Sequence, residues 1–163
     1  MESELKILVI GPPKSGKSKI ANYLSGGSET TYKPCAGVRV LTTKKFIAPS
    51  SPSPTGVRIL TTKKSVTPSS PSPEAKEYTT IEIWDISCEK KFEGVWPTAR
   101  EGCDGVVLVL NGDKEFDENL FLELILNFPK EMRLPPSLCV GLLHHSKWRN
   151  RSRQAPKFLQ VWP

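Results

Sequence analysis

Residues 11–18 have the residue types and the spacing of a loop that binds phosphate. They read Gly11-Pro12-Pro13-Lys14-Ser15-Gly16-Lys17-Ser18 and match the pattern G-x-x-x-x-G-K-[ST]. In such a loop the backbone N–H groups surround phosphate oxygens, and the positive end of the following helix faces them. Lys17 would contact the terminal phosphates of a nucleotide, and the Ser18 hydroxyl would be a ligand for Mg²⁺. We therefore predict nucleotide contacts from residues 11–18 and from Lys19.

The segments on either side of this loop have the patterns of a strand and a helix. Residues 5–10 form a short, nearly continuous apolar run, which is typical of a buried strand in a parallel sheet. Ile20 and Leu24 lie four residues apart and would share one face of a helix over 17–25, which Gly26 and Gly27 would end. A strand, this loop and a helix in succession are the context in which the motif binds phosphate.

A second candidate ligand for Mg²⁺ lies at the end of another strand. Residues 79–85 alternate between polar and apolar side chains, which predicts a half-exposed strand. The strand ends in Trp84-Asp85, and a carboxylate at such a strand end can hold Mg²⁺ through a water molecule. Ser18 and Asp85 are therefore candidate metal ligands.

The rest of the chain alternates between strand and helix patterns. Further strands are predicted at 105–110, 138–144 and 158–162. One helix is expected at 92–100, limited by Pro97, and another at 113–127, capped by Asp113, with Phe116, Leu120 and Leu124 on its inner face. This order predicts an α/β layered fold with a mostly parallel sheet and right-handed crossovers. The length of 163 residues suits one domain, over residues 1–163.

A 19-residue unit occurs twice in the first half of the chain. Residues 37–45 (GVRVLTTKK) recur as 56–64 (GVRILTTKK), and each copy is followed by a tail rich in Pro and Ser. Two copies without an apolar stacking face do not form a solenoid. The tails cannot bury apolar area, so we predict a long disordered insert at about 37–75 that contributes one short strand.

The charge and composition of the chain exclude several classes of partner. The net charge is +6, but residues 30–73 hold seven basic and no acidic residues, against 16 basic and 17 acidic residues elsewhere. The basic segment lacks the interleaved aromatic residues of single-strand binders, so we predict no nucleic-acid partner. No apolar run reaches the ~20 residues of a membrane span, and no C-terminal Cys box is present. Four cysteines without a C-x-x-C pair indicate neither zinc nor a redox motif. We expect a monomeric, cytoplasmic protein without a direct membrane anchor.

Several motifs follow the phosphate loop in a fixed order. They are Trp84-Asp85, Glu93-Gly94-Val95-Trp96-Pro97, Asp104-Gly105-Val106-Val107 and Leu143-His144-His145-Ser146-Lys147. This order, from about Leu5 to Lys147, resembles the intraflagellar transport protein 22 family, the Rab-like small GTPase subunits of the intraflagellar transport B complex. The resemblance implies a three-layer small GTPase fold, GTP or GDP with Mg²⁺, and docking on a coiled-coil pair of subunits, the 74/81 pair. It also implies a location at the cilium or flagellum and its base.

Comparison with the small GTPase pattern leaves the first switch open. That pattern supplies a Thr to Mg²⁺ within Pro-Thr-x-Gly, whereas the first repeat copy has Cys35 at this position, and a thiol is a poor Mg²⁺ ligand. The second copy has Thr55, one residue short of the expected spacing. Spacing favours the first copy as the second strand, while ligand chemistry favours Thr55. The chain ends at Pro163, just past the last predicted strand, so we expect either that the last helix of this fold is absent or that the sequence is truncated.

The second switch predicts little or no GTP hydrolysis. Glu89 stands where a Gln normally orients the attacking water, and its carboxylate would repel the γ-phosphate. Cys88 replaces the Gly whose backbone N–H contacts that phosphate. GTPases that keep the Gln hydrolyse GTP intrinsically at only about 10⁻⁴ s⁻¹. We expect a nucleotide-dependent adaptor that is slower still.

The motif that normally reads guanine is also missing. His144, His145 and Lys147 occupy the matching strand end, and a His side chain there would contact the base. Candidate partner contacts are Arg39 or Arg58, Trp84, Phe92 and Trp96, with core packing as the alternative for the tryptophans. Two other functions remain open, an active GTPase with an unusual switch and a P-loop kinase for a small molecule.

Overall fold

The central sheet of the computed structural model contains five strands among the residues that the structure describes, which are 3–27, 35–46, 78–115 and 117–145. They are β1 (Ser3–Ile10), β2 (Val38–Phe46), β3 (Tyr78–Ile86), β4 (Gly105–Asn111) and β5 (Cys139–His144). The strand order is β2-β3-β1-β4-β5, and only β2 runs antiparallel to its neighbour. The predicted α/β class with a mostly parallel sheet is confirmed. The predicted strand at 158–162 lies outside the described residues.

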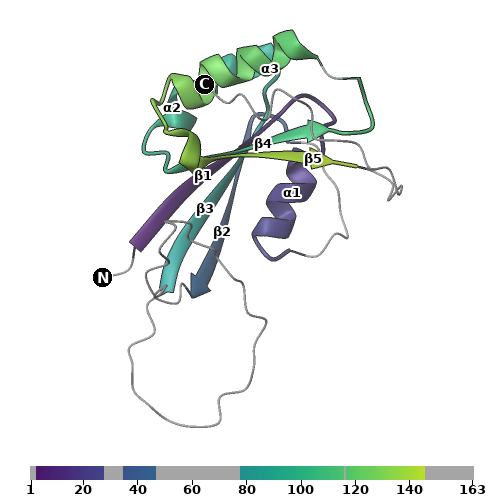
Figure 1. Cartoon of the computed structure of the whole chain (residues 1–163). Helices are drawn as coiled ribbons and strands as arrows, with labels where there is room; N and C mark the ends of the chain where they lie inside the picture. The colour runs from purple at the N-terminus through teal and green to yellow at the C-terminus, as the bar shows by residue number, and fades with distance from the viewer. Residues whose placement is uncertain (1–2, 28–34, 47–77, 116, 146–163) are drawn as a thin grey trace, which may run out of the picture.

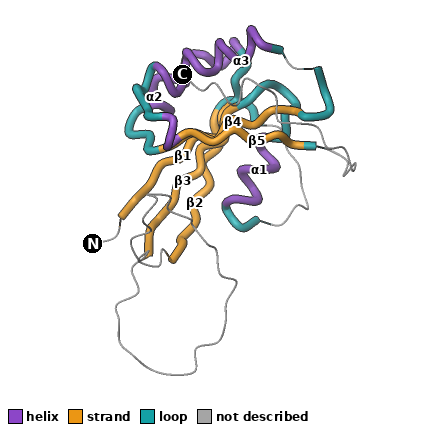
Figure 2. Tube along the Cα trace, viewed as in Figure 1, coloured by secondary structure: helices purple, strands orange, loops and turns teal. Residues whose placement is uncertain are grey.

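Helices cover both faces of this sheet (Figure 1). Helix α1 (Lys17–Leu24) packs on one face through Ala21, against Val9, Ile83 and Val109. Helices α2 (Trp96–Arg100) and α3 (Glu118–Ile125) lie on the other face, where the larger apolar cluster includes Leu8, Ile10, Leu108, Leu124 and Phe128. Figure 2 shows the resulting layers, with helices in purple on either side of the strands in orange. None of the described helices is both long and apolar enough to span a bilayer.

The first copy of the repeat forms the second strand. Val38–Phe46 is β2, and it pairs with β3 so that Arg39 lies opposite Asp85 and Val40 opposite Trp84. The copy favoured by spacing is therefore the one in the sheet. The second copy, with Thr55 and Arg58, lies outside the described residues.

The region around Pro97 differs from its prediction. A 3-10 helix covers Lys90–Val95, and α2 then begins at Trp96 with Pro97 in its first turn. Proline suits this position because the first N–H groups of a helix have no intrahelical acceptor. Pro97 thus helps to start α2 rather than limit it.

The predicted helix at 113–127 begins later than expected. Its N-cap is Asp117, whose side chain accepts the N–H of Leu120 at 3.0 Å. Asp113 lies in the turn after β4, where its N–H is bonded to Asn111 Oδ1 at 2.9 Å and its carboxylate lies 3.3 Å from the His145 ring. The prediction that Asp113 caps this helix was therefore wrong. The buried inner face consists of Phe121, Leu124, Ile125 and Phe128, while Leu120 is half-buried and Phe116 lies outside the described residues. A π-helical turn, Leu126–Lys130, extends α3 past its predicted end at 127 and contains Pro129.

The two candidate tryptophans have different roles. Trp96 is only 3% exposed; its ring centroid lies 5.2 Å from that of Phe128, and its indole N–H donates to Ser87 O at 3.2 Å. Trp96 is therefore a core residue. Trp84 is half-buried, with the ammonium group of Lys6 3.8 Å from its ring centroid and its indole N–H bonded to Glu82 at 2.9 Å.

Candidate functional site

The carboxyl ends of the four parallel strands bring the predicted site residues to one edge of the sheet. β1 leads into the loop at 11–16, β3 ends beside Asp85, and β4 and β5 end at Asn111 and His144. Crevices at the carboxyl ends of strands are where open α/β sheets bind ligands. The fold therefore gathers residues that are up to 133 positions apart in the sequence, from Gly11 to His144.

Glycines at both ends of the phosphate loop allow a close approach that no side chain would permit. A Cβ atom on Gly11 would lie 2.2 Å from the carbonyl oxygen of Val109 in β4. Gly16 has φ +93° and precedes α1, and a Cβ atom there would lie 2.5 Å from Nδ1 of His144. The loop is thus wedged between β4 and the end of β5, and His144 lies directly against it.

Two polar side chains of the loop are buried, one without an ion-pair partner and the other without a hydrogen-bond partner among the described residues. Lys17 is only 8% exposed, and it forms no ion pair with any carboxylate in the part of the chain that the structure describes. Ser15 is fully buried, and its hydroxyl has no hydrogen-bond partner among the residues that the structure describes. Buried cations and hydroxyl groups are normally paired. Both groups lie at the N-terminal end of α1, which favours an anion, so the loop is arranged to accept one.

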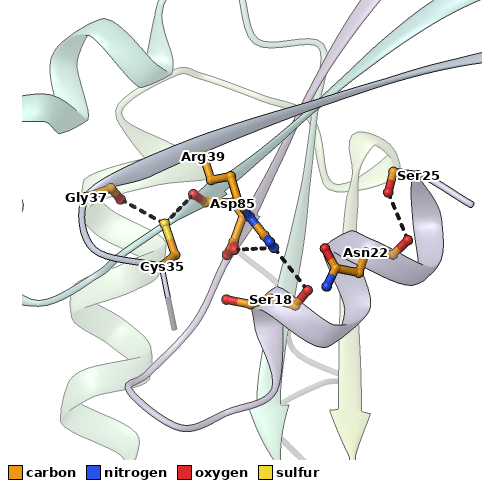
Figure 3. A network of polar contacts seen from close by, with 7 residues as sticks. All are labelled: Ser18, Asn22, Ser25, Cys35, Gly37, Arg39 and Asp85. Atoms are coloured by element: carbon orange, nitrogen blue, oxygen red, sulfur yellow. Dashed lines mark hydrogen bonds and ion pairs between the residues drawn. The ribbon is translucent and has the colours of Figure 1, made fainter. Parts of the chain in front are cut away.

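Asp85 lies beside the loop and is bonded to an arginine (Figure 3). Its carboxylate is fully buried, and Oδ2 lies 3.0 Å from Nη2 of Arg39 on β2. The same Nη2 donates to the backbone oxygen of Ser18 at 3.3 Å. Within the described part of the chain, Asp85 Oδ1 and Arg39 Nε are buried without hydrogen-bond partners. Arg39 therefore links the first turn of α1 to the end of β3.

The segment before β2 is hydrogen-bonded to the end of β3, next to Asp85 (Figure 3). The Cys35 thiol donates to the backbone oxygen of Asp85 at 3.1 Å, and the N–H of Ser87 donates to Gly37 O at 2.7 Å. Burial, with a smaller contribution from the Asp85 charge, raises the pKa of the Cys35 thiol. Cys35 thus stays a neutral hydrogen-bond donor rather than becoming a thiolate.

The segment after β3 has its own internal partners. Cys88 is buried, and its sulfur accepts the N–H of Gly11 at 3.4 Å; burial raises the pKa of its thiol to about 11. The carboxylate of Glu89 lies 2.8 Å from the ammonium group of Lys91. The hydrogen bond from Lys91 lowers the pKa of Glu89, so its side chain is a carboxylate at neutral pH.

The end of β4 contains a polar residue that the sequence patterns missed, Asn111, which lies opposite His144 of β5. Asn111 donates from Nδ2 to the backbone oxygen of Lys14 at 3.2 Å, and Lys14 has the uncommon φ of 61°. The His145 ring lies 3.3 Å from the carboxylate of Asp113. Asn111 thus fixes a strained residue of the phosphate loop. Its place at the end of a central strand was the only sequence signal for this role.

The structure brings together most of the predicted site residues. Ser18, Asp85 and the loop at 11–16 are adjacent, His144 contacts the loop, and His145 is held one residue further on by Asp113. Lys19 is exposed, and so are Pro13 and Lys14 of the loop. Lys147 and Thr55, predicted as base and metal contacts, lie outside the described residues. The role of Arg39 at Asp85 was missed because it depends on the register between β2 and β3.

The predicted magnesium site has suitable donors but is not a preformed cluster. Within the described ranges, no group of three or more His, Cys, Asp or Glu side chains could hold a metal ion. The unpartnered Asp85 Oδ1 and the Ser18 hydroxyl are the oxygen donors that Mg²⁺ prefers, with phosphate oxygens and water completing such sites. The residues present therefore fit the ion through one free carboxylate oxygen.

Comparison with known proteins supports the resemblance found in the motifs. No family model matches the chain. Intraflagellar transport protein 22 homolog of Xenopus tropicalis is 28% identical over 142 residues, covering 85% of this chain and 64% of that protein. The Rattus norvegicus homolog is 30% identical over 141 residues, with coverages of 86% and 64%. This chain therefore spans 64% of the length of these relatives.

The fold has a counterpart among solved structures. The GTP-bound crystal structure of T. brucei IFT22/74/81 superposes with a TM-score of 0.63 at 24% identity, covering 98% of this chain and 79% of that chain. The predicted small GTPase fold is thereby confirmed for the described elements, and the resemblance to the intraflagellar transport protein 22 family is confirmed as well.

Proposed function

We propose that residues 1–163 form one guanine-nucleotide-binding domain that acts as an adaptor subunit in intraflagellar transport. The observation that carries the nucleotide part is the pair of buried polar groups in the phosphate loop. Lys17 has no carboxylate partner among the described residues, and the Ser15 hydroxyl has no hydrogen-bond partner. The β-phosphate of GTP or GDP would satisfy both. Ser18 and Asp85 are the residues that would hold Mg²⁺ where the ion is bound.

The nucleotide proposal is tested by calorimetric titration of the full chain with GTP, GDP and ATP. Charge-assisted hydrogen bonds from Lys17 to two phosphate oxygens are worth about 3 kcal/mol or more, so Lys17→Ala should weaken binding roughly 100-fold. Lys45→Ala is the matched control, because Lys45 is a half-exposed lysine of β2 outside the site. Equal binding to wild type and Lys17→Ala would refute the site. Equal affinity for ATP and GTP would show that the His144-His145 end does not select guanine.

The adaptor part rests on the relatives. The GTP-bound T. brucei structure contains IFT22 with two further subunits, 74 and 81. By analogy, this chain would dock on a coiled-coil pair through the surface around Arg39, Trp84 and Phe92, in the cytoplasm and at the cilium or flagellum and its base. Co-purification with such a pair should weaken for Lys17→Ala and Ser18→Asn. Undiminished co-purification of nucleotide-free protein would contradict a nucleotide-dependent adaptor.

The proposal includes little or no GTP hydrolysis. Glu89 cannot donate a hydrogen bond as a carboxylate, and its ion pair with Lys91 keeps it ionised. It therefore cannot accept a hydrogen bond from an attacking water and donate one to a phosphate oxygen at the same time, as an amide side chain does. Single-turnover phosphate release should be no faster than about 10⁻⁴ s⁻¹ for wild type and faster for Glu89→Gln. Faster release by wild type than by Glu89→Gln would favour an active GTPase.

A further inference from the structure

The guanidinium group of Arg39 lies at the predicted metal position, and the proposed function gives it no role there. Arg39 Nη2 lies 3.0 Å from Asp85 Oδ2 and 3.3 Å from the backbone oxygen of Ser18. Asp85 and Ser18 are the same two residues that would hold Mg²⁺. One carboxylate charge is thus already neutralised by a side chain of the protein itself.

The position of Arg39 is fixed by the backbone around it. The pairing of β2 with β3 places Arg39 opposite Asp85. The turn before β2 is bonded to the end of β3 through Cys35 and Gly37. Asp85 is fully buried and the Arg39 side chain is 31% exposed, so the charge of the guanidinium acts in a partly desolvated place. A divalent cation at Asp85 would be repelled by this charge unless Arg39 moved away.

The ion pair is nevertheless incomplete, which makes exchange feasible. Arg39 contacts Asp85 through one nitrogen rather than in the two-point arrangement that strengthens Arg–carboxylate pairs. Asp85 Oδ1 and Arg39 Nε both remain without partners. A cation could therefore approach Oδ1 and displace the guanidinium.

We propose that Arg39 and a divalent cation compete for Asp85, and that Arg39 is the resident cation. Lys17 and Arg39 then supply two positive charges beside the phosphate loop without any metal. Nucleotide binding by this chain is accordingly almost independent of Mg²⁺, a consequence that rests on the proposed nucleotide function. The competition itself concerns only the protein and the metal.

The metal alone tests the competition in nucleotide-free protein. Thermal unfolding is followed at matched ionic strength, with and without about 5 mM MgCl₂. The proteins compared are wild type, Arg39→Gln and the double variant Arg39→Gln/Asp85→Asn. Wild type should not respond, because its carboxylate already has a cation. Mg²⁺ should raise the Tm of Arg39→Gln by roughly 4 °C or more, and should not affect the double variant.

Each possible result decides the proposal. If Arg39→Gln folds poorly without metal, Mg²⁺ should restore folding, as should the charge-conserving Arg39→Lys. A Tm increase in wild type equal to that of Arg39→Gln overturns the competition. An Arg39→Gln protein that does not respond to Mg²⁺, whether folded or not, overturns it too.

Nucleotide affinity gives a second readout. The ratio of the GDP Kd in EDTA to the Kd in Mg²⁺ should stay within about threefold for wild type and for the control Lys45→Ala. It should rise about tenfold or more for Arg39→Gln, since a charged hydrogen bond is lost only when no metal replaces it. An equally large ratio in wild type would contradict the proposal. No binding in either buffer would refute the nucleotide function, while the metal experiment would still decide the competition.

Discussion

The phosphate loop and the segments that face it satisfy their polar groups in opposite ways. In the loop, Lys17 is buried without an ion pair, and the hydroxyl of Ser15 is buried without a hydrogen bond, among the described residues. In the facing segments, Asp85 is paired with Arg39 and Glu89 with Lys91, while the Cys35 thiol is bonded to a backbone oxygen. The loop is therefore prepared for an external anion, whereas the facing segments are bonded mainly to the protein.

This difference separates two functions that are often joined in one site. In the proposed function, binding of the phosphates shared by GDP and GTP would depend on the loop, and sensing of the third phosphate would depend on the facing segments. A chain that keeps the first and alters the second would bind nucleotide without a strong response to hydrolysis. If the polar groups of the facing segments serve mainly to stabilise the fold, their removal should lower the free energy of unfolding.

A large effect is expected from breaking the Asp85–Arg39 pair. Asp85→Asn removes a buried charge partner and should lower the free energy of unfolding by about 2 kcal/mol, less than for a wholly buried pair because Arg39 is partly exposed. The matched control is Glu123→Gln, which removes an exposed ion pair with Lys90 of 3.7 Å and should cost less than about 0.5 kcal/mol. Urea unfolding measures both, and equal losses would mean that the Asp85 pair is not structural.

Cys88 should make stability fall in alkaline solution. Burial raises the pKa of its thiol from 9.0 to about 11, so the folded protein holds this proton more tightly than the unfolded chain does. The stabilisation is complete below pH 9 and is lost as the pH rises through about 11, a change of about 2–3 kcal/mol. Urea unfolding of Cys88→Ala between about pH 8 and 11 should show a shallower decline than wild type. An identical decline would show that Cys88 does not cause it.

The contact between the loop and β5 can be broken and repaired. Gly16→Ala forces a side chain into positive φ and against the His144 ring, which should cost roughly 1–3 kcal/mol of stability. His144→Ala in the same chain removes the clash but not the backbone strain, so it should recover part of the loss. A double-mutant cycle measures this coupling, and strict additivity would show that the two residues do not touch in solution.

The smallest expected effect concerns the repeat. Because the first copy forms β2, deletion of residues 56–74 shortens the connection between β2 and β3 and leaves the sheet intact. The smaller loop-closure entropy should stabilise the protein by roughly 0.8 kcal/mol. A large destabilisation in urea unfolding would indicate that the second copy contributes to the folded core.

The sequence predicted the local features of the site better than its long-range pairs. The phosphate loop, β1 and β4 follow from a motif and from apolar runs, which are local signals. The partnership of Arg39 with Asp85 joins residues 46 positions apart across a sheet register, and the duplicated unit offered two candidate arginines. Asn111 was missed for the same reason, because its contact with Lys14 exists only once β1 and β4 are neighbours.

The start of α3 shows a different limit. Asp113 and Asp117 are both acceptable caps in the sequence. In the structure the carboxylate of Asp113 lies against the His145 ring, 32 positions away, while that of Asp117 accepts the N–H of Leu120. For Trp96 the sequence likewise allowed two roles, a partner contact or a core residue. Its packing against Phe128 shows that it is a core residue.

The most direct test of the account is the ratio of the dissociation constants of GDP and GTP for the full chain. If the binding free energy comes from the phosphate loop, and the facing segments are bonded to the protein, the two constants should differ by no more than about threefold, or about 0.6 kcal/mol. A preference for GTP of about 100-fold would mean that the facing segments recognise the third phosphate, and would contradict the account.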